Sequence, residues 1–406
     1  MKLIFIGGLF SEEQIKSVYK NSKTMPNMAA NVHQWNIING LPDEIDIINP
    51  LFLGNYPDEY KKAFVGREEW SHKEGSKNVS PATLNIFGLK QILRLFNLTY
   101  EIRKKIKENK KDVVVVVYSL NTSFLASLRL ALIGYRKIPT CLIVPDLPLF
   151  YINNAGKNRF YRILKTLDWK LMLLLCKKID SFVLLTEAMK DKINVADRPY
   201  MISEGICEND PTDYDNQIET NSITYTGTLD REFGVLDLIR NFRAVAKEDW
   251  ILNIAGGGNA KKEIEAISLK DKRIHYCGIL TNVETKTLQR SSRILINPRS
   301  SDAEFTKYSF PSKTMEYLKA GRPVIMHKLP GIPLEYDEYL TYFENTTDEA
   351  FQKGLLAIMA KTDKELNEIG KSGKMFVERE KSSTVQGKKI SEFLIVISRG
   401  KQNNEI

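Results

Sequence analysis

Cysteine is scarce in this 406-residue chain. The four cysteines lie far apart and form no CxxC pair: Cys141, Cys176, Cys207 and Cys277. Because disulfide frameworks and structural zinc sites need clustered cysteines, this spacing predicts reduced thiols in a cytoplasmic protein. Long apolar runs are missing too. No run approaches the length that spans a bilayer, and the short apolar run after Lys2 does not fit a secretory signal.

Signatures of several protein classes are also absent. The segment 254–260, IAGGGNA, has three consecutive glycines, so it lacks both the GxGxxG spacing of dinucleotide-binding proteins and the lysine-serine ending of a P-loop. This disfavours a dehydrogenase or an NTPase. The chain shows no carboxylate pair at hydrolase spacing, and it lacks the basic, aromatic-interleaved motif that a nucleic-acid-binding protein would need.

The composition is that of a globular protein with room for two cores. Hydrophobic residues make up 43% of the chain and charged residues 27%. The length of 406 residues exceeds what one ordinary core holds, so we expect two domains of roughly 200 residues. The formal net charge of +9 predicts an anionic partner, which is nucleic acid, a phosphorylated ligand or an acidic membrane face.

Short β-branched runs alternate with longer helical patterns along the chain. This alternation predicts an α/β fold with parallel sheets and crossover helices. The expected strands are residues 2–8, 112–118, 140–146, 181–187 and 200–203 in the first half, and 222–228, 250–258, 273–278, 293–299 and 323–328 in the second. We therefore predict two doubly wound Rossmann-like domains that face each other across a cleft.

One polar segment sets the predicted domain boundaries. Residues 207–222, CENDPTDYDNQIETNS, are acidic and nearly free of apolar side chains, which indicates a linker. The predicted division is residues 1–206 for the first domain, 207–221 for the hinge, 222–380 for the second domain and 381–406 for a C-terminal helix that crosses back to the first. Ligands bind at the carboxyl ends of strands in such folds, so candidate residues belong there.

Two segments of the first domain carry candidate ligand-binding residues. Gly8 lies in the glycine pair after the first strand, which allows close approach of a ligand, although a tight turn explains it equally well. Residues 26–40, PNMAANVHQWNIING, mix apolar and polar side chains as a helix packed on a sheet would. The polar groups offered to a polyhydroxylated ligand are Asn27, Asn31, His33 and Asn36. The alternative is a set of helix caps with a solvated histidine.

Asp146 is a candidate catalytic group. It follows an apolar strand and stands between Pro145 and Pro148, whose rigidity would hold the carboxylate in one place at the mouth of the cleft. The alternative is an aspartate in a turn that bonds its own backbone. Its position at the end of a strand favours the functional role.

In the second domain, cations follow two strand ends. YTGTLDREFG, residues 225–234, places Arg231 beyond a glycine turn, where a guanidinium suits a diphosphate, although an exposed surface arginine is the ordinary case. The strand at 293–299 is followed by further polar and basic side chains. These are Asn297, Arg299, Lys307 and Lys313.

A short helix is expected in YSFPSKTMEYLKAGRPVI, residues 308–325. Ser309 or Ser312 can cap it, Pro311 fits its first turn and Gly321 ends it, so the amides at its start form a site for an anion. Lys313 adds a positive charge there, and Glu316, one turn on, can accept both hydroxyls of a ribose. This predicts a nucleoside diphosphate along the helix start. The rival interpretation is a simple Lys313–Glu316 surface ion pair.

Residues 157–178, KNRFYRILKTLDWKLMLLLCKK, carry seven basic residues against one acid. Apolar residues recur at helical spacing, namely Phe160, Ile163, Leu164, Leu167, Leu171 and Leu174. A basic amphipathic helix of this kind lies on an anionic membrane. The alternative is a core-facing crossover helix with a solvated basic side.

Residues 222–335 resemble the donor-binding domain of GT-B glycosyltransferases and are most similar to bacterial family 4 enzymes of capsule, exopolysaccharide and O-antigen assembly. The resemblance lies in YTGTLDREFGVLDLI, WILNIAGGG, RIHYCGIL, ILINPR, FTKYSFPSKTMEYLKAGRPVI and GIPLEY. The first domain, from MKLIFIGG through VPDLP and LLTEAM, is similar in layout. The resemblance to these glycosyltransferases implies transfer of a sugar from a nucleotide sugar, usually UDP-linked, with retention and without a metal or another cofactor. The implied acceptor is a glycan or a polyprenyl-diphosphate-linked glycan at the inner face of the cell membrane.

Several positions depart from the family pattern. Glu316 takes the second place of an E-x7-E pattern that holds the ribose, but Tyr308 stands in the first. Thr228 and Phe233 replace an arginine and a lysine, and Asp146 stands where many members have histidine. The diphosphate is then expected to meet Arg231, Arg299 and Lys313.

The resemblance and the strand-end positions together give a full set of site residues. Donor-binding residues are expected to be Gly227, Arg231, Gly257, Ile279, Asn297, Arg299, Tyr308, Ser309, Phe310, Ser312, Lys313 and Glu316. Acceptor-binding residues are Gly8, Asn27, Asn31, His33 and Asn36, and catalytic residues are Asp146, Lys313 and Arg231. Two other functions fit the same layout: a sugar-nucleotide epimerase and a non-catalytic sugar-nucleotide-binding protein.

Overall fold

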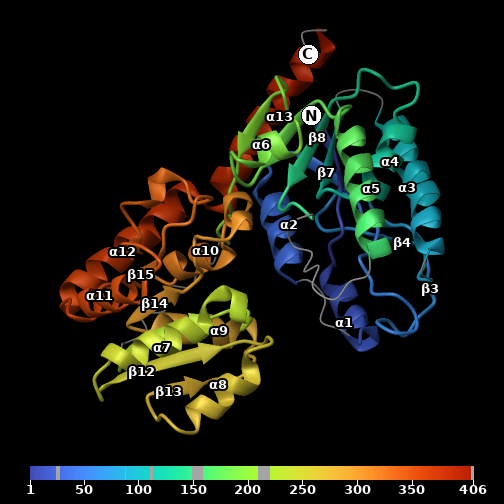
Figure 1. Cartoon of the computed structure of the whole chain (residues 1–406). Coiled ribbons are helices and arrows are strands. Elements are labelled where there is room, and N and C mark those ends of the chain that lie inside the picture. The colour runs from blue at the N-terminus through green and yellow to red at the C-terminus, as the bar shows by residue number, and fades with distance from the viewer. Residues whose placement is uncertain (24–27, 87, 110–112, 149–158, 209–219, 404–406) are drawn as a thin grey trace. The chain divides into compact units, whose positions relative to one another are not determined.

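The computed structural model describes residues 1–23, 28–86, 88–109, 113–148, 159–208 and 220–403. The chain divides into two compact units (Figure 1). Unit 1 comprises Met1–Ile206 with Ser383–Ile406, and unit 2 comprises Cys207–Ser382. Most of the predicted hinge, residues 209–219, lies outside the described residues.

Unit 1 is built on a mostly parallel sheet of eight strands in the order β10-β9-β8-β7-β1-β2-β5-β4. Its strands are β1 (Lys2–Ile6), β2 (Glu44–Ile48), β4 (Glu68–Trp70), β5 (Asn78–Ser80), β7 (Val113–Tyr118), β8 (Thr140–Val144), β9 (Ser181–Leu184) and β10 (Tyr200–Ile202). Central β7 reads VVVVVY and is buried throughout. A continuous β-branched run of this kind is typical of a parallel strand covered on both faces. A separate two-stranded sheet pairs β3 (Phe64–Val65) with β6 (Thr83–Leu84).

Helices accompany this sheet at the positions that its crossovers require. They are α1 (Glu12–Asn21), α2 (Met28–Gly40), α3 (Leu89–Glu108), α4 (Thr122–Ala131), α5 (Arg159–Cys176), α6 (Met189–Lys192) and α13 (Ser383–Gln402). The C-terminal α13 packs on α2 within unit 1. Gly40 permits this approach, because a Cβ there would lie 1.9 Å from the carbonyl oxygen of Ser383. Ile390 and Leu394 of α13 enter the core beside Leu3.

Unit 2 has a parallel sheet of six strands in the order β13-β12-β11-β14-β15-β16. Its strands are β11 (Asn221–Thr226), β12 (Trp250–Ala255), β13 (Ile274–Tyr276), β14 (Ile294–Asn297), β15 (Val324–His327) and β16 (Thr341–Phe343). Its helices are α7 (Val235–Val245), α8 (Lys261–Ser268), α9 (Asn282–Ser291), α10 (Ser312–Lys319), α11 (Asp348–Met359) and α12 (Asp363–Glu380). Three short 3-10 turns, η1 (Arg231–Phe233), η2 (Glu304–Tyr308) and η3 (Leu334–Tyr336), interrupt the loops.

The predicted fold class is confirmed, because both units are doubly wound α/β sheets. Each of the ten expected strands is present, although most end two or three residues earlier than predicted, where the chain turns into a loop. The sequence analysis missed β2, which neighbours β1 in the sheet. The reason is Asp46, a charged residue in the middle of EIDII that breaks the apolar pattern.

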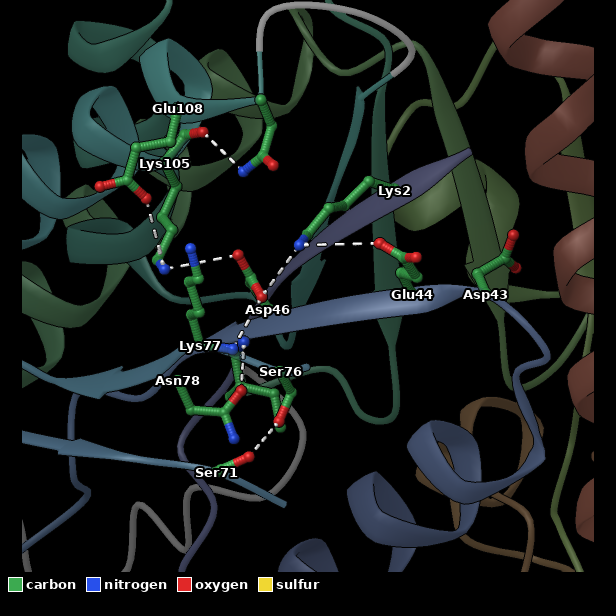
Figure 2. A network of polar contacts seen from close by, with 12 residues as sticks. Lys2, Asp43, Glu44, Asp46, Ser71, Ser76, Lys77, Asn78, Lys105 and Glu108 are labelled. Carbon is green, nitrogen blue, oxygen red and sulfur yellow. Dashed lines mark hydrogen bonds and ion pairs between the residues drawn. The ribbon is translucent and has the colours of Figure 1, made fainter. Parts of the chain in front are cut away.

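Asp46 is held in the interior of unit 1 by cations from other elements (Figure 2). Its side chain is 1% exposed and lies 3.4 Å from Nζ of Lys2 in β1 and 3.4 Å from Nζ of Lys105 in α3. The amide of Lys77 donates to its Oδ1 at 2.9 Å. A buried charge is tolerated only with such partners, so β2 becomes a strand through contacts that are distant in sequence.

We expect Asp46→Asn to lower the free energy of unfolding of unit 1 by about 2 kcal/mol, because the buried Lys105 and the partly buried Lys2 lose their buried counter-ion, while the hydrogen bond from the Lys77 amide is retained. Urea denaturation measures this loss. Glu44→Gln is the matched control, since Glu44 is 83% exposed and 3.9 Å from the same Lys2. It should change stability by less than about 0.5 kcal/mol, and equal effects of the two substitutions would contradict the assignment.

Candidate functional site

In unit 2, a buried tyrosine ties α10 to the end of β11. Tyr317 is fully buried, and its Oη accepts from the amide of Thr226 at 2.8 Å and donates to the carbonyl oxygen of Thr226 at 3.1 Å. Thr226 is the last residue of β11, directly before the turn that begins at Gly227. The start of the helix and the carboxyl end of the strand are thereby held at a fixed distance.

Glu316, the predicted ribose ligand, is held from two sides. Lys313 Nζ lies 2.6 Å from its Oε2, so the ion pair of the rival interpretation exists. Gln289 Nε2 also approaches Oε2 at 3.3 Å, and the same amide donates to Thr226 Oγ1 at 2.8 Å. Gln289 is 1% exposed. A buried amide that links the carboxylate to the strand end is more than a surface ion pair requires.

The start of α10 differs in detail from the prediction. Pro311 is the N-cap residue, and no side chain caps the helix. The predicted serine cap is therefore wrong: Ser309 is buried outside the helix and Ser312 is its exposed first residue. Because the first turn lacks a side-chain acceptor, its amides and Lys313 together suit an anionic group.

The triple glycine of residues 256–258 mainly serves the packing of two loops. A Cβ at Gly256 would lie 1.8 Å from the carbonyl oxygen of Gly227, and one at Gly258 would lie 2.4 Å from the carbonyl carbon of Leu229. The loops after β11 and β12 are therefore in backbone contact. Gly257 is different, because a Cβ there would meet only Ile279, at 3.3 Å. The predicted donor residues Gly257 and Ile279 thus lie side by side.

The two predicted diphosphate arginines have different surroundings. Arg231, in η1, forms an ion pair with Glu263 of α8, so part of its charge is already compensated. Arg299 lies over the ring of Phe233, with its guanidinium carbon 4.3 Å from the ring centroid. Phe233 stands where the glycosyltransferases that this chain resembles have a lysine. The structure therefore brings a cation from another loop to that place.

Four of the predicted donor residues are buried. Tyr308 in η2 and Ser309 after it are 8% and 1% exposed, and Phe310 packs on Tyr336 with ring centroids 5.3 Å apart. Asn297, at the end of β14, is also buried and accepts from the amide of Arg299 at 3.3 Å. These side chains shape the loop that leads into α10, and any ligand contact of residues 308–310 would fall to their backbone atoms.

In unit 1, three polar side chains lie near the carboxyl ends of β7 and β8. His33 Nδ1 of α2 is 2.9 Å from Oη of Tyr118, the last residue of β7. Burial lowers the pKa of His33 to about 4, so the histidine is neutral at pH 7, and the solvated alternative is wrong. Burial also raises the pKa of Asp146, which follows β8. The pKa of Tyr118 is raised mainly by burial and further by the Asp146 carboxylate.

The other predicted acceptor residues have structural contacts. Asn31 is buried, and its Oδ1 accepts from the amide of Phe10 at 2.7 Å. Asn36 donates to the carbonyl oxygen of Ile206 at 3.3 Å. Gly8 leaves room for the ring of Phe52, which a Cβ would meet at 1.9 Å. Asn27 lies outside the described residues, and the acceptor role of all four stays a prediction.

Sequence reasoning missed some polar groups near these strand ends. Gln289 has no local signal, because a glutamine in a helix is ordinary. Tyr118 ends a strand run, and that position was its only signal. Lys90 and Arg94 of α3 are buried, and they donate to the carbonyl oxygens of Leu53 and Leu51 in the loop after β2. Burial lowers their pKa values to about 8 and about 10. Only the folded chain brings these cations to that loop.

Residues 220–361 match the family model Glyco_trans_1_4, described as glycosyl transferases group 1. This range contains β11, α10 and every predicted donor residue. The matched range, residues 220–361, is called the group 1 domain below because of this similarity. A sequence comparison with curated proteins finds no match. Within the described residues, this group 1 domain and unit 1 contain no cluster of three or more His, Cys, Asp or Glu residues that would hold a metal ion.

Solved structures extend the similarity of fold beyond the group 1 domain. Sucrose-phosphate synthase from Thermosynechococcus elongatus is 10% identical, with a TM-score of 0.60 over 98% of this chain and 99% of its own. The lipopolysaccharide outer core galactosyltransferase WaaB is 14% identical, with a TM-score of 0.59 over 98% and 99%. A trehalose-6-phosphate protein from E. coli, bound with UDP-2-fluoro glucose, is 10% identical, with a TM-score of 0.62 over 98% and 99%. These likenesses concern the GT-B fold.

Proposed function

We propose that the protein transfers a hexosyl group from a UDP-sugar to a glycan or a polyprenyl-diphosphate-linked glycan, with retention, as a family 4 enzyme of capsule, exopolysaccharide or O-antigen synthesis. One observation carries this proposal. Within the group 1 domain, Glu316 is held by Lys313 and the buried Gln289 beside the uncapped start of α10. A carboxylate next to an anion-binding helix start fits a ribose next to a diphosphate.

The roles within the donor site follow from this geometry. Glu316 accepts hydrogen bonds from the two ribose hydroxyls, and Gln289 keeps its carboxylate oriented. The amides of the first turn of α10 and Lys313 bind the diphosphate, with Arg299 or Arg231 as the further cation. A preorganised positive site stabilises the charge that develops on the leaving nucleoside diphosphate.

The transfer step needs no carboxylate pair from the protein. The bond between the anomeric carbon and the β-phosphate oxygen breaks, and the acceptor oxygen forms the new bond on the same face of the sugar. The departing phosphate takes the proton of the acceptor hydroxyl. Asp146 of unit 1 is proposed as the polar group that meets the reacting sugar, and the neutral His33 and Tyr118 beside it as acceptor contacts.

A lipid-linked acceptor would place the enzyme at the inner face of the cell membrane as a peripheral protein. The predicted contact of residues 157–178 with anionic lipid belongs to this proposal, and residues 157 and 158 lie outside the described part of the chain. The donor is proposed to be UDP-linked because the resemblance of residues 222–335 implies it.

A panel of UDP-hexoses, each offered with and without polyprenyl-diphosphate-linked glycans, tests the proposal. We expect UDP release and an elongated glycan with one donor, in the presence of an acceptor, and NMR should show the donor's anomeric configuration in the product. Without acceptor, the sugar should stay unchanged apart from slow hydrolysis. Conversion of the sugar to its epimer, or UDP binding without turnover on any acceptor, would contradict the proposal.

A further inference from the structure

The apolar stripe of α5 points away from the core of unit 1. Five of its aliphatic side chains are between 44% and 59% exposed: Ile163, Leu164, Leu167, Leu171 and Leu174. The helix meets the core through Met172 and Cys176 instead, which are 4% and 0% exposed. The core-facing interpretation of this stripe is therefore wrong for these five residues, and the packing of unit 1 does not explain them.

The neighbouring helix α3 carries a second stripe of the same kind. Its inner side is buried through Leu98, Ile102 and Ile106. Its outer side exposes between 36% and 64% of five further apolar side chains, which recur every three or four residues: Leu89, Ile92, Leu93, Phe96 and Tyr100. A helix that needs only one apolar side for its core thus presents a second one to solvent.

These stripes belong to one continuous layer (Figure 1). Helix α4 lies between α3 and α5 and contacts both. Ser127 Oγ of α4 donates to the carbonyl oxygen of Leu95 in α3 at 3.1 Å, and Thr122 Oγ1 donates to Asp168 of α5 at 2.6 Å. Leu130 and Ile133 add exposed apolar area between the stripes. These elements, called here the three-helix face, hold twelve of the 25 exposed large apolar side chains of the described residues.

The exposed charges of the three-helix face are basic with one exception. Its exposed basic residues are Lys107, Arg129, Arg136, Lys137, Arg159, Arg162, Lys170, Lys177 and Lys178. Glu108 is the one exposed acid on these elements within the described residues. Asp168 is half-buried, and its Oδ1 accepts a hydrogen bond from Thr122 Oγ1. The three-helix face therefore combines rows of exposed apolar side chains with exposed basic residues on the same elements.

We propose that the three-helix face is a docking surface for an anionic lipid bilayer. Aliphatic and aromatic side chains such as Phe96 and Tyr100 would enter the interfacial region, where aromatic rings are favoured, and the basic residues would contact anionic headgroups. The binding is peripheral, because no described helix is long and apolar enough to cross a membrane. The site extends the lipid contact proposed above for residues 157–178 to α3 and α4, and it is tested separately from the sugar transfer.

Charge favours lipid over a second copy of the chain as the occupant. A symmetric dimer through this face would set two cationic surfaces against each other, which is unfavourable. A bilayer with anionic headgroups instead attracts each basic residue near its surface, and this attraction adds to the burial of apolar side chains. An exposed apolar surface of this extent on a free protein otherwise promotes aggregation.

Flotation of the full chain with phosphatidylcholine vesicles that contain about 30% phosphatidylglycerol tests the proposal. We expect the protein to float with these vesicles and to remain unbound with pure phosphatidylcholine or at high salt, because screening weakens the headgroup contacts. The double variant Ile92→Ser with Phe96→Ser should lower the partition coefficient at least about tenfold, and Leu167→Ser with Leu171→Ser should do the same.

The matched control is Leu269→Ser with Val396→Ser, which alters two exposed apolar residues outside the three-helix face and should float like the original protein. Circular dichroism and UDP affinity check that each variant is folded and competent. Absence of flotation, or equal flotation of all variants, overturns the proposal. A dimer in light scattering that the α3 variant dissociates, without flotation, assigns the face to a second copy instead. UDP binding and transfer to a soluble glycan report on the proposed function separately.

Discussion

Replacing Glu316 with alanine is expected to weaken UDP binding by at least about a hundredfold, or about 3 kcal/mol, because two hydrogen bonds from the ribose hydroxyls to a carboxylate disappear. The loss should be large because Gln289 holds the carboxylate in place, with its Nε2 3.3 Å from Oε2, so little ordering is needed on binding. Titration calorimetry with UDP measures the change directly.

The control for Glu316 is Glu378 of α12, whose partner lies at the other end of α10. Glu378 pairs with Lys319 of α10 at 2.7 Å, which resembles the Lys313–Glu316 pair in chemistry but is remote from the β11 end. Glu378→Ala should leave the UDP affinity within about twofold. Unchanged affinity of Glu316→Ala would remove the ribose role and leave the pair as a surface ion pair. The Glu316→Ala substitution should also weaken the binding of uridine by most of the factor seen with UDP, because uridine keeps the ribose and lacks the diphosphate.

Asp146→Asn is expected to lower turnover by about a hundredfold to a thousandfold while the UDP affinity stays near its original value. The reason is that Asp146 belongs to unit 1, whereas the proposed nucleotide contacts all belong to unit 2, and the substitution removes the charge while it keeps the shape. Steady-state kinetics with a saturating donor gives the turnover, and calorimetry gives the affinity. Equal losses in both would indicate a structural role.

The pH dependence provides a second test of Asp146. Burial raises the pKa of this carboxyl, so its charged form is lost at a higher pH than that of an ordinary aspartate. Turnover should therefore fall as the pH decreases through this raised pKa, and the fall should be missing in the asparagine variant. Asp191→Asn, at an exposed position of α6, is the matched control and should retain the profile of the original protein.

Local signals in the sequence indicated much of the proposed donor site, because its residues lie close together in the chain. The distance from Lys313 to Glu316 is one helical turn, and Pro311 marks the start of that helix in any context. The serine cap failed for a tertiary reason, since Ser309 is drawn into the core beside Gly331. Gln289 could not be found, because its role exists only where α9 approaches α10.

For the proposed acceptor residues, in contrast, local sequence signals say little and tertiary contacts decide. His33, Tyr118 and Asp146 are separated by tens of residues, and only the order β8-β7-β1 of the sheet brings their elements together. The neutrality of His33 follows from burial, which the sequence around it does not reveal. The outward stripe of α3 was likewise hidden, because the spacing of Leu89, Ile92 and Phe96 is the same for a core face and for an exposed face.

By itself, the sequence determined the fold class, ten of the strands, the helix that starts at Ser312 and the ion pair within it, because each depends on periodicity or on contacts one turn apart. Only the tertiary structure decided that Asp46 is buried in a strand, that Gln289 holds Glu316 and that α3 and α5 turn apolar rows to solvent. The physical reason is that burial is a property of what packs on a residue. That packing partner lies elsewhere in the chain and leaves no local trace.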